Sequence, residues 1–476
     1  MAFISPANLA TLHAVGSADI TALQGSPSGR YASVRPGNQD QVPIVPDAAL
    51  FRCLPTTDPG PKALPTASEC AVHLEMLAVF RALRGAVIQS NDLDKAFGIS
   101  PRRTVRYRKK REGWKYVAVP VEIRDPAWED RRKLKWKYYL SIAAARFHMW
   151  INLVNEHLGK AAVGAPPLKE LLLPPLDVLV IWHGFLLNCE DFNNYCVMHN
   201  LQYIQDVAFP WTQIHGAINS DTWEYTLPND HSDWLKNVRN LEPDLLTALC
   251  EAGKSTSALH TLLTTFESCS VSDTETVCGD DSPLFRTIKA ARRSEELNEP
   301  LVENVQRQCI FVDKMHGHCW IRNPAAAGTM RRAVDRYDKF LHLFRLYPKQ
   351  FLVPMLDIDL AWHTHQCSAQ NYRNLVTERV GRFINHDDKI GRDALDDGFA
   401  SADQWYRLAF GEQYQVCQCW SCEAIFSAVE ELDEELLDDQ AAIDGIVKDV
   451  EQRVHYHREL EIARRLDRDL PLWSHK

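Results

Sequence analysis

Pro174-Pro-Leu-Asp-Val-Leu-Val-Ile-Trp-His183 and Pro354-Met-Leu-Asp-Ile-Asp-Leu-Ala-Trp-His363 are two versions of one segment. Trp362 follows Trp182 by 180 positions, and the offset continues without a gap beyond the quoted residues. An internal repeat is the first feature to establish, because it sets the architecture of the chain before any single motif is interpreted. We therefore predict two pseudo-repeated helical units, with one copy of this segment in each.

The composition indicates a globular protein that is mainly α-helical. The chain has 476 residues, of which 45% are hydrophobic and 24% are charged, so it is too long for a single core and has enough apolar material for two. Apolar residues recur mostly at helical spacing. The clearest alternating pattern, Trp114–Ile123, contains Pro120, which restricts it to an edge strand or an extended segment. Few short strands are expected.

Breaker residues and changes of composition divide the chain into five parts. We predict a disordered tail, a first helical unit, a Ser/Thr-rich linker, a second helical unit and a charged C-terminal helix, at residues 1–66, 67–250, 251–282, 283–426 and 427–476.

The charge balance and the cysteine count exclude several classes of protein. Lys and Arg total 53 against 63 acidic residues, so the whole chain lacks the basic field typical of nucleic-acid-binding proteins. No apolar run is long enough to span a membrane, and no signal peptide precedes the fold, so we expect a cytoplasmic or nuclear protein without membrane contact. The 13 cysteines are scattered through a long chain, which argues against a disulfide framework.

One short segment is strongly basic, although the whole chain has a net negative charge. Residues 102–111 hold seven Lys or Arg residues with Tyr107 among them, and Trp114 and Tyr116 follow. Basic residues interleaved with aromatic ones could bind phosphates and stack on bases. The alternatives are a solvated loop or helix face, which the overall charge favours, and pairing with the acidic run 430–439 of the same chain.

The repeat separates structural residues from candidate chemical ones. Residues found in both copies are expected to serve the fold: Asp177, Trp182 and His183 in the first copy, and Asp357, Trp362 and His363 in the second. For the two aspartates we predict a capping or helix-dipole role. Polar residues confined to the second copy are candidates for chemistry, namely Asp359 as a possible site acid, His365 and Cys367.

Two clusters have the ligand types that zinc prefers. The first is His363, His365 and Cys367, and the second is Cys417, Cys419 and Cys422. We predict that His365 and at least two of these last three cysteines hold one zinc ion. For His363 and His365 to share an ion, the helix would have to end between them, because residues two apart on a helix point in nearly opposite directions. In the alternative interpretation His363 bonds to Asp359 one turn earlier, and the cysteines are buried hydrophobic residues.

The second copy, continued through Thr364-His-Gln366, resembles the signature of the glycine-rich domain-containing protein-like family. Further segments are similar to that family: Val305–Met315, Gly328–Ala333 and Val416–Ala424. The resemblance runs from about residue 67 to 430 and implies a largely helical domain, without naming an activity. The first copy departs from the family at Gly184-Phe185, where a polar, His-containing pair is usual.

Three functional hypotheses follow. The first is an intracellular helical module that binds a partner protein or a small ligand, with a structural zinc ion. The second is a metal-dependent enzyme of fungal specialised metabolism, which uses Asp359, the two histidines and the cysteines. The third is nucleic-acid binding through residues 102–111, which the net charge disfavours. A large apolar pocket lined by the candidate residues would favour the enzyme, whereas a sealed core would favour the module.

Overall fold

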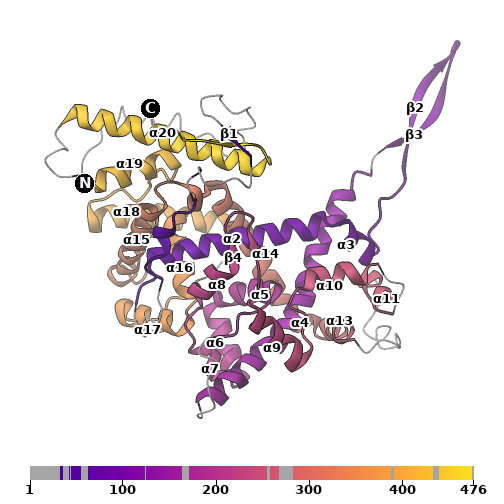
Figure 1. The fold of residues 1–476 in the computed structure, drawn as a ribbon, viewed down its shortest axis with the longest axis horizontal. Coiled ribbons are helices and arrows are strands. Elements are labelled where there is room, and N and C mark those ends of the chain that lie inside the picture. Colours follow the sequence, from indigo (N-terminus) through magenta and orange to yellow (C-terminus); the bar gives the residue numbers. More distant parts are fainter. Residues whose placement is uncertain are drawn as a thin grey trace. The chain divides into compact units, whose positions relative to one another are not determined.

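The structure is a computed structural model that describes residues 33–35, 42, 44–54, 63–123, 125–162, 171–254, 258–266, 282–386, 391–432 and 439–473. These residues form eighteen α-helices and three two-stranded sheets (Figure 1). The prediction of a mainly helical protein with few short strands is confirmed. Among the described helices, none combines the length and the apolar character that a membrane crossing requires.

The described chain forms two compact units, and each is assembled from separate stretches of sequence. Unit 1 comprises residues 1–79, 186–226 and 307–476, and unit 2 comprises residues 80–185 and 227–306, as far as these are described. Two of the four unit boundaries fall inside the long helices α2 (Ala67–Gln89) and α14 (Glu295–His318). This division differs from the contiguous units predicted from the sequence, because a long helix can contribute to two cores and composition does not mark such a boundary.

The repeated segment forms a helix of the same length in both copies. Helix α5 spans Leu176–Leu186 and helix α16 spans Leu356–Gln366, so the two helices begin 180 positions apart. The helices that follow, α6 (Cys189–Met198) and α17 (Ala369–Val380), begin with the same offset. Trp182 lies in unit 2 and Trp362 in unit 1, and their side chains are only 2% and 4% exposed. The prediction that both segments share one secondary structure and bury their tryptophan is confirmed.

A long helix precedes the repeated segment in each copy and pairs with its aspartate. In unit 2, Arg146 of α4 (Trp128–Ala162) donates from Nε to Asp177 at 2.6 Å. In unit 1, Arg336 of α15 (Ala326–Leu346) donates from Nε to Asp357 at 2.7 Å. Both aspartates lie in the first turn of their helix, as expected from the dipole, but their side chains form buried ion pairs. The buried ion pair is a further interaction of each aspartate, which the sequence analysis did not predict.

Unit 2 also contains five shorter helices. They are α3 (Asn91–Ala96), α9 (Asn229–Arg239), α10 (Leu245–Ala252), α11 (Ala258–Thr264) and α13 (Pro283–Arg293). Helix α11 forms inside the segment predicted as a Ser/Thr-rich linker, because Leu262 and Leu263 are buried. Of that predicted linker, residues 255–257 and 267–281 lie outside the described part.

Unit 1 also contains several shorter elements and the helix α18. They are η1 (Ala48–Phe51), α7 (Gln202–Gln205), α8 (Trp211–Ala217), the strand pair β4 (Ile218–Asn219) and β5 (Glu224–Tyr225), η2 (Trp320–Arg322) and α18 (Arg392–Phe410). Element η1 lies within the tail that was predicted to be disordered. Its Leu50 is buried, and the Leu50 carbonyl accepts a hydrogen bond from Ser68 at 2.6 Å. Most of the rest of that predicted tail lies outside the described residues.

The C-terminal region consists of two helices and a strand, not one charged helix. Helix α19 spans Trp420–Glu430, α20 spans Gln440–Arg465, and strand β6 (Leu470–Pro471) pairs with β1 (Ser33–Val34). Helix α20 buries an apolar face, which shares a core with residues near the N-terminus: Val42, Val45, Tyr456, Leu460, Ala463 and Leu470. Because charged residues are abundant in α20, its apolar face was not recognised from the sequence.

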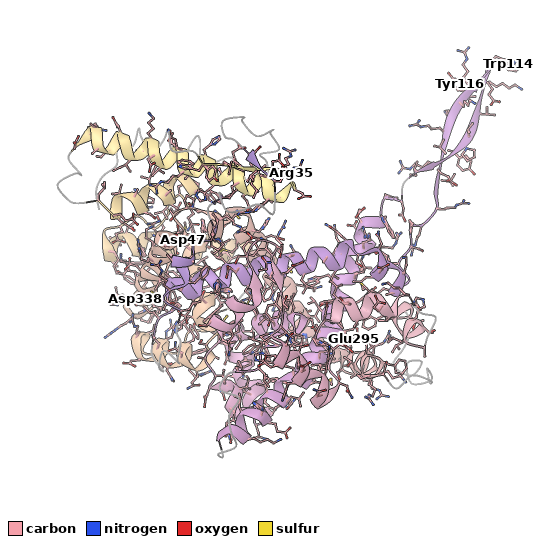
Figure 2. The ribbon with its side chains drawn as sticks, in the orientation of Figure 1. Arg35, Asp47, Trp114, Tyr116, Glu295 and Asp338 are labelled. Carbon is pink, nitrogen blue, oxygen red and sulfur yellow. The ribbon has the colours of Figure 1, made fainter. Side chains whose placement is uncertain are left out.

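The basic run forms a β-hairpin in unit 2, which corrects the loop or helix expected for it. Strand β2 (Thr104–Glu112) pairs antiparallel with β3 (Lys115–Ile123), and Gly113 supplies the positive φ of 63° in the turn. Strand β3 is exposed along most of its length, and Pro120 lies opposite Tyr107. Figure 2 shows Trp114 and Tyr116 at the tip of the hairpin. Residues 433–438, the centre of the proposed acidic partner, lie outside the described chain.

Candidate metal and ligand site

Unit 1 contains a large cavity, with a volume of about 1240 Å³. Much of its wall is aromatic, with contributions from Phe311, Phe344, Phe351, Trp362, Phe399 and Trp420. The sequence candidates Asp359, His363, Cys417 and Cys419 also line it. A cavity of this size that combines an apolar wall with a few polar groups is typical of a small-molecule site. We refer to it as the unit 1 cavity.

Helix α16 points its two histidines in different directions. His363 lines the unit 1 cavity, whereas His365 is buried in the core, where its Nδ1 lies 2.9 Å from the hydroxyl of Tyr337. The helix continues to Gln366, so the break expected between the two histidines is not observed. Because residues two apart on a continuous helix face nearly opposite sides, His363 and His365 do not share an ion here.

Three cysteines come together at the start of α19. The Sγ atoms of Cys417, Cys419 and Cys422 all lie within 4.8 Å of one another, and all three are free thiols. We call them the cysteine cluster. Among the described His, Cys, Asp and Glu residues no other joins this group. The prediction that His365 shares a metal ion with these cysteines is therefore wrong for this structure. The cluster could hold a metal ion, because thiolates are ligands of zinc.

Hydrogen bonds hold the cysteine cluster against the rest of unit 1. Gln418, between the first two cysteines, donates from Nε2 to Asp357 at 2.6 Å, and its carbonyl accepts a bond from the Trp320 indole at 2.9 Å. The indole of Trp420 donates to the carbonyl of His318 at 2.6 Å. The buried Arg336–Asp357 pair is therefore connected directly to the loop that carries the cysteines.

The electrostatics of the cluster favour a thiolate at its centre. Hydrogen bonds from the Cys417 and Cys422 thiols lower the pKa of the Cys419 thiol well below its ordinary value. Cys419 is also the N-cap residue of α19, where the helix dipole favours negative charge. A metal ligand must be deprotonated, so this arrangement suits metal binding.

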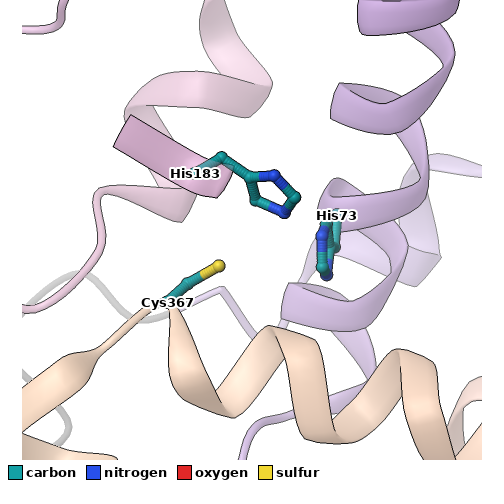
Figure 3. A group of neighbouring side chains, drawn as sticks. All are labelled: His73, His183 and Cys367. Atoms are coloured by element: carbon teal, nitrogen blue, oxygen red, sulfur yellow. The ribbon is translucent and has the colours of Figure 1, made fainter. Parts of the chain in front are cut away.

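Cys367 lies apart from the cysteine cluster, in a different part of unit 1. Figure 3 shows it at the end of α16 with His73 of α2, and its Sγ lies within 4.8 Å of a ring nitrogen of His73. Burial raises the pKa of the Cys367 thiol well above its ordinary value, so the residue behaves as a neutral hydrophobic side chain. Figure 3 also draws His183 on α5, the repeat counterpart of His363.

A second group on the wall of the unit 1 cavity consists of Asp359, His363 and His386. Asp359 Oδ1 lies 3.3 Å from His363 Nε2 and 3.5 Å from His386 Nε2, and the two Nε2 atoms are 3.1 Å apart. We call it the carboxylate–histidine group. Burial alone would raise the pKa of Asp359, but His363 and His386 together lower it below its ordinary value. The expected Asp359–His363 pair is therefore present and gains a third member.

The sequence reasoning missed His386. This residue follows α17 in an irregular segment, 23 positions after His363, and it belongs to neither motif. No spacing rule connects a loop histidine to a helix that lies so far upstream.

Comparison with known proteins supports the resemblance found in the sequence. Residues 280–375 match the family model described as "Glycine-rich domain-containing protein-like". This segment is a glycine-rich domain-containing protein-like domain. A stretch of 276 residues, 56% of the chain, is 24% identical to "Glycine-rich domain-containing protein 2" and 22% identical to "Glycine-rich domain-containing protein 1", both from Arabidopsis thaliana. The matched stretch covers 28% of each of these relatives. No solved structure matches the chain.

The glycine-rich domain-containing protein-like domain contains only part of the site. It includes all of α16, with Asp359 and both of its histidines, and it ends before His386 and the cysteine cluster. The residues that complete both groups therefore come from the chain beyond the domain.

Proposed function

We propose that unit 1 binds a small organic ligand in its cavity, beside a zinc ion held by the cysteine cluster. The single observation that carries this proposal is that Cys417 and Cys419 line the cavity. A small ligand suits an aromatic-walled cavity better than a protein partner does, because a partner surface would be flatter and more exposed.

The charge of the cavity wall indicates the kind of ligand. Cationic side chains outnumber carboxylates on it: Arg307, Lys314, Arg382 and Arg458 against Asp359 and Asp396. Together with the aromatic wall, this favours an amphipathic molecule with an anionic group.

The number of cysteines bears on the role of the zinc ion. Structural zinc sites use four protein ligands, and sites with three protein ligands keep one position for water or substrate. Because the described residues provide three donors, the cysteine cluster favours an accessible zinc over a purely structural one. The metal-dependent enzyme thereby gains support as an alternative to a pure binding module.

Elemental analysis of the purified protein tests the zinc site. We expect about one equivalent of zinc to be lost when Cys419 and Cys422 are both replaced by serine, because hydroxyls are poor ligands for this ion. Cys367→Ser is the matched control, since this cysteine lies outside the cluster. Zinc content that is the same in the wild type and the double variant would refute the proposal.

A second candidate function concerns the β2–β3 hairpin, which we propose to be a binding surface for single-stranded nucleic acid. Eight Lys or Arg residues and two acidic residues lie within 102–123. Tyr107, Trp114 and Tyr116 are 72%, 82% and 69% exposed. Exposed aromatic rings among cations can stack on bases while the cations contact phosphates. The local excess of positive charge on the hairpin favours nucleic-acid binding, although the whole chain carries a net negative charge.

Salt dependence tests the hairpin proposal. We expect the affinity for a labelled oligothymidine to fall about 50-fold between 50 and 200 mM salt, as when roughly four phosphates of a single strand are neutralised. Fluorescence anisotropy would measure it. Replacing Arg106, Arg108 and Lys110 with glutamine should abolish most of the binding. The control variant replaces three exposed lysines of α4, Lys133, Lys137 and Lys160. Equal affinity in the two variants would exclude the hairpin.

A further inference from the structure

The carboxylate–histidine group has an arrangement that hydrogen bonds alone do not satisfy. Its three edges measure 3.1, 3.3 and 3.5 Å, so Asp359 Oδ1 and the Nε2 atoms of His363 and His386 form a nearly regular triangle. Each Nε2 carries at most one proton, so hydrogen bonds can serve at most two of the three edges, and when both rings donate to Asp359 the edge between the two Nε2 atoms has no bond. A shared cation would instead attract all three atoms at once.

The size of the triangle fits a first-row transition ion. Bonds of about 2.0–2.1 Å at tetrahedral angles place neighbouring ligand atoms about 3.3 Å apart, which is the mean of the three observed edges. Two imidazoles and one carboxylate are a donor set suited to borderline ions such as zinc, cobalt(II) and iron(II).

The surrounding residues hold the three ligands in place. Asp359 and His363 lie one turn apart on α16, which puts both side chains on one face of the helix. The indole of Trp362 donates to the Tyr372 hydroxyl at 2.9 Å, and that hydroxyl donates to the carbonyl of Ile384 at 2.6 Å. These bonds fix the segment that carries His386, whose ring also meets the Trp362 ring edge-on at 5.1 Å. The repeated tryptophan therefore positions a ligand in this copy.

The group is also accessible from the cavity. All three residues line the unit 1 cavity, and the side chains of Asp359 and His386 are 21% and 12% exposed. Three protein ligands leave at least one coordination position for an exogenous donor. In the first copy of the repeat, Leu179 occupies the position equivalent to Asp359, so that copy has no carboxylate there.

We propose that Asp359, His363 and His386 form a second metal site, which binds a divalent transition ion with an open position toward the unit 1 cavity. The metal site itself stands independently of the cysteine cluster. Its role in ligand binding rests on the proposed function: an anionic oxygen of the cavity ligand would occupy the open position.

Cobalt(II) distinguishes the two sites, because thiolate ligands give intense charge-transfer absorption whereas nitrogen and oxygen ligands give only weak visible bands. We expect the metal-depleted full-length chain to bind two equivalents of cobalt. His386→Ala should bind one equivalent and keep the thiolate absorption. The Cys419→Ser/Cys422→Ser variant should bind one equivalent and show only the weak bands. His342→Ala, an exposed histidine outside the cavity, should behave like the wild type.

The outcomes separate the two proposals. Identical cobalt content in His386→Ala and the wild type would overturn the second site, whatever the cysteine variant does. Unchanged thiolate absorption in the cysteine variant would overturn the proposed function and leave the second site standing.

Acetohydroxamate probes the open position. Added to the cobalt-loaded cysteine variant, it should shift the weak visible bands, and the shift should be absent when His386 is also replaced. Failure of the hydroxamate to shift the bands would contradict an open position facing the cavity.

Discussion

Replacing Asp357 with alanine is expected to lower the free energy of unfolding by about 3–5 kcal/mol, because it leaves the buried Arg336 guanidinium without its counterion. The Asp357 side chain accepts bonds from Arg336 at 2.7 Å and from Gln418 at 2.6 Å, and it is 8% exposed. Urea unfolding of the variant and the wild type would measure the difference. A loss of unfolding free energy below about 1 kcal/mol is typical of an exposed ion pair. It would show that the Arg336–Asp357 pair does not stabilise the fold as a buried ion pair does.

The repeat provides a matched control for this substitution. Asp177→Ala removes the equivalent partner of Arg146 in unit 2, where the same kind of buried pair exists at 2.6 Å. Both variants should be destabilised, but only Asp357 bonds to the loop of the cysteine cluster. We therefore expect Asp357→Ala alone to lose zinc affinity. Equal zinc content in the two variants would show that the Gln418 bond does not order the cluster.

Acidification from pH 7 to pH 5 is expected to cost about 2 kcal/mol of stability through His365, with the full effect approaching about 5 kcal/mol near pH 3. Burial lowers the pKa of His365 from 6.5 to about 3. In the unfolded chain this imidazole takes up a proton below about pH 6.5, whereas in the folded protein it stays neutral. The stability that depends on neutral His365 is thus complete above pH 6.5 and is lost as the pH falls toward 3.

A substitution isolates this contribution. His365→Gln removes the titrating group and retains a polar atom for the Tyr337 hydroxyl, which lies 2.9 Å from the ring in the wild type. The loss of unfolding free energy between pH 7 and pH 5 should shrink by about 2 kcal/mol in this variant. His342→Gln, at an exposed position, should leave the pH dependence unchanged. A pH dependence that is the same in the wild type and His365→Gln would show that other groups govern acid unfolding.

The sequence was sufficient for the architecture of the repeat. The offset of 180 positions predicted two equivalent helices with buried tryptophans, and α5 and α16 have that arrangement. Local periodicity determines such features, because the spacing of apolar residues decides which face of a helix is buried. The same reasoning identified the cysteine cluster, whose three members lie within six residues and therefore within reach of one another in most backbone conformations.

The division into units was beyond the reach of the sequence. Helices α2 and α14 each contain a unit boundary, and nothing in their composition marks it. The basic run was likewise ambiguous: its charges suit a solvated helix face as well as a strand. The run forms a strand because it pairs with Lys115–Ile123. Such pairing depends on both segments, so the sequence of the run alone does not predict it.

By itself, the sequence determined the helical repeat, the buried tryptophans and the grouping of neighbouring cysteines. Only the tertiary structure decided which histidine reaches which partner. Helix α16 continues past His365, which sends that ring into the core beside Tyr337 and leaves His363 on the cavity wall. The segment after α17 then brings His386 to within 3.1 Å of His363. The physical reason is that a ligand set depends on the directions of side chains from distant segments, and packing sets those directions after each helix has formed.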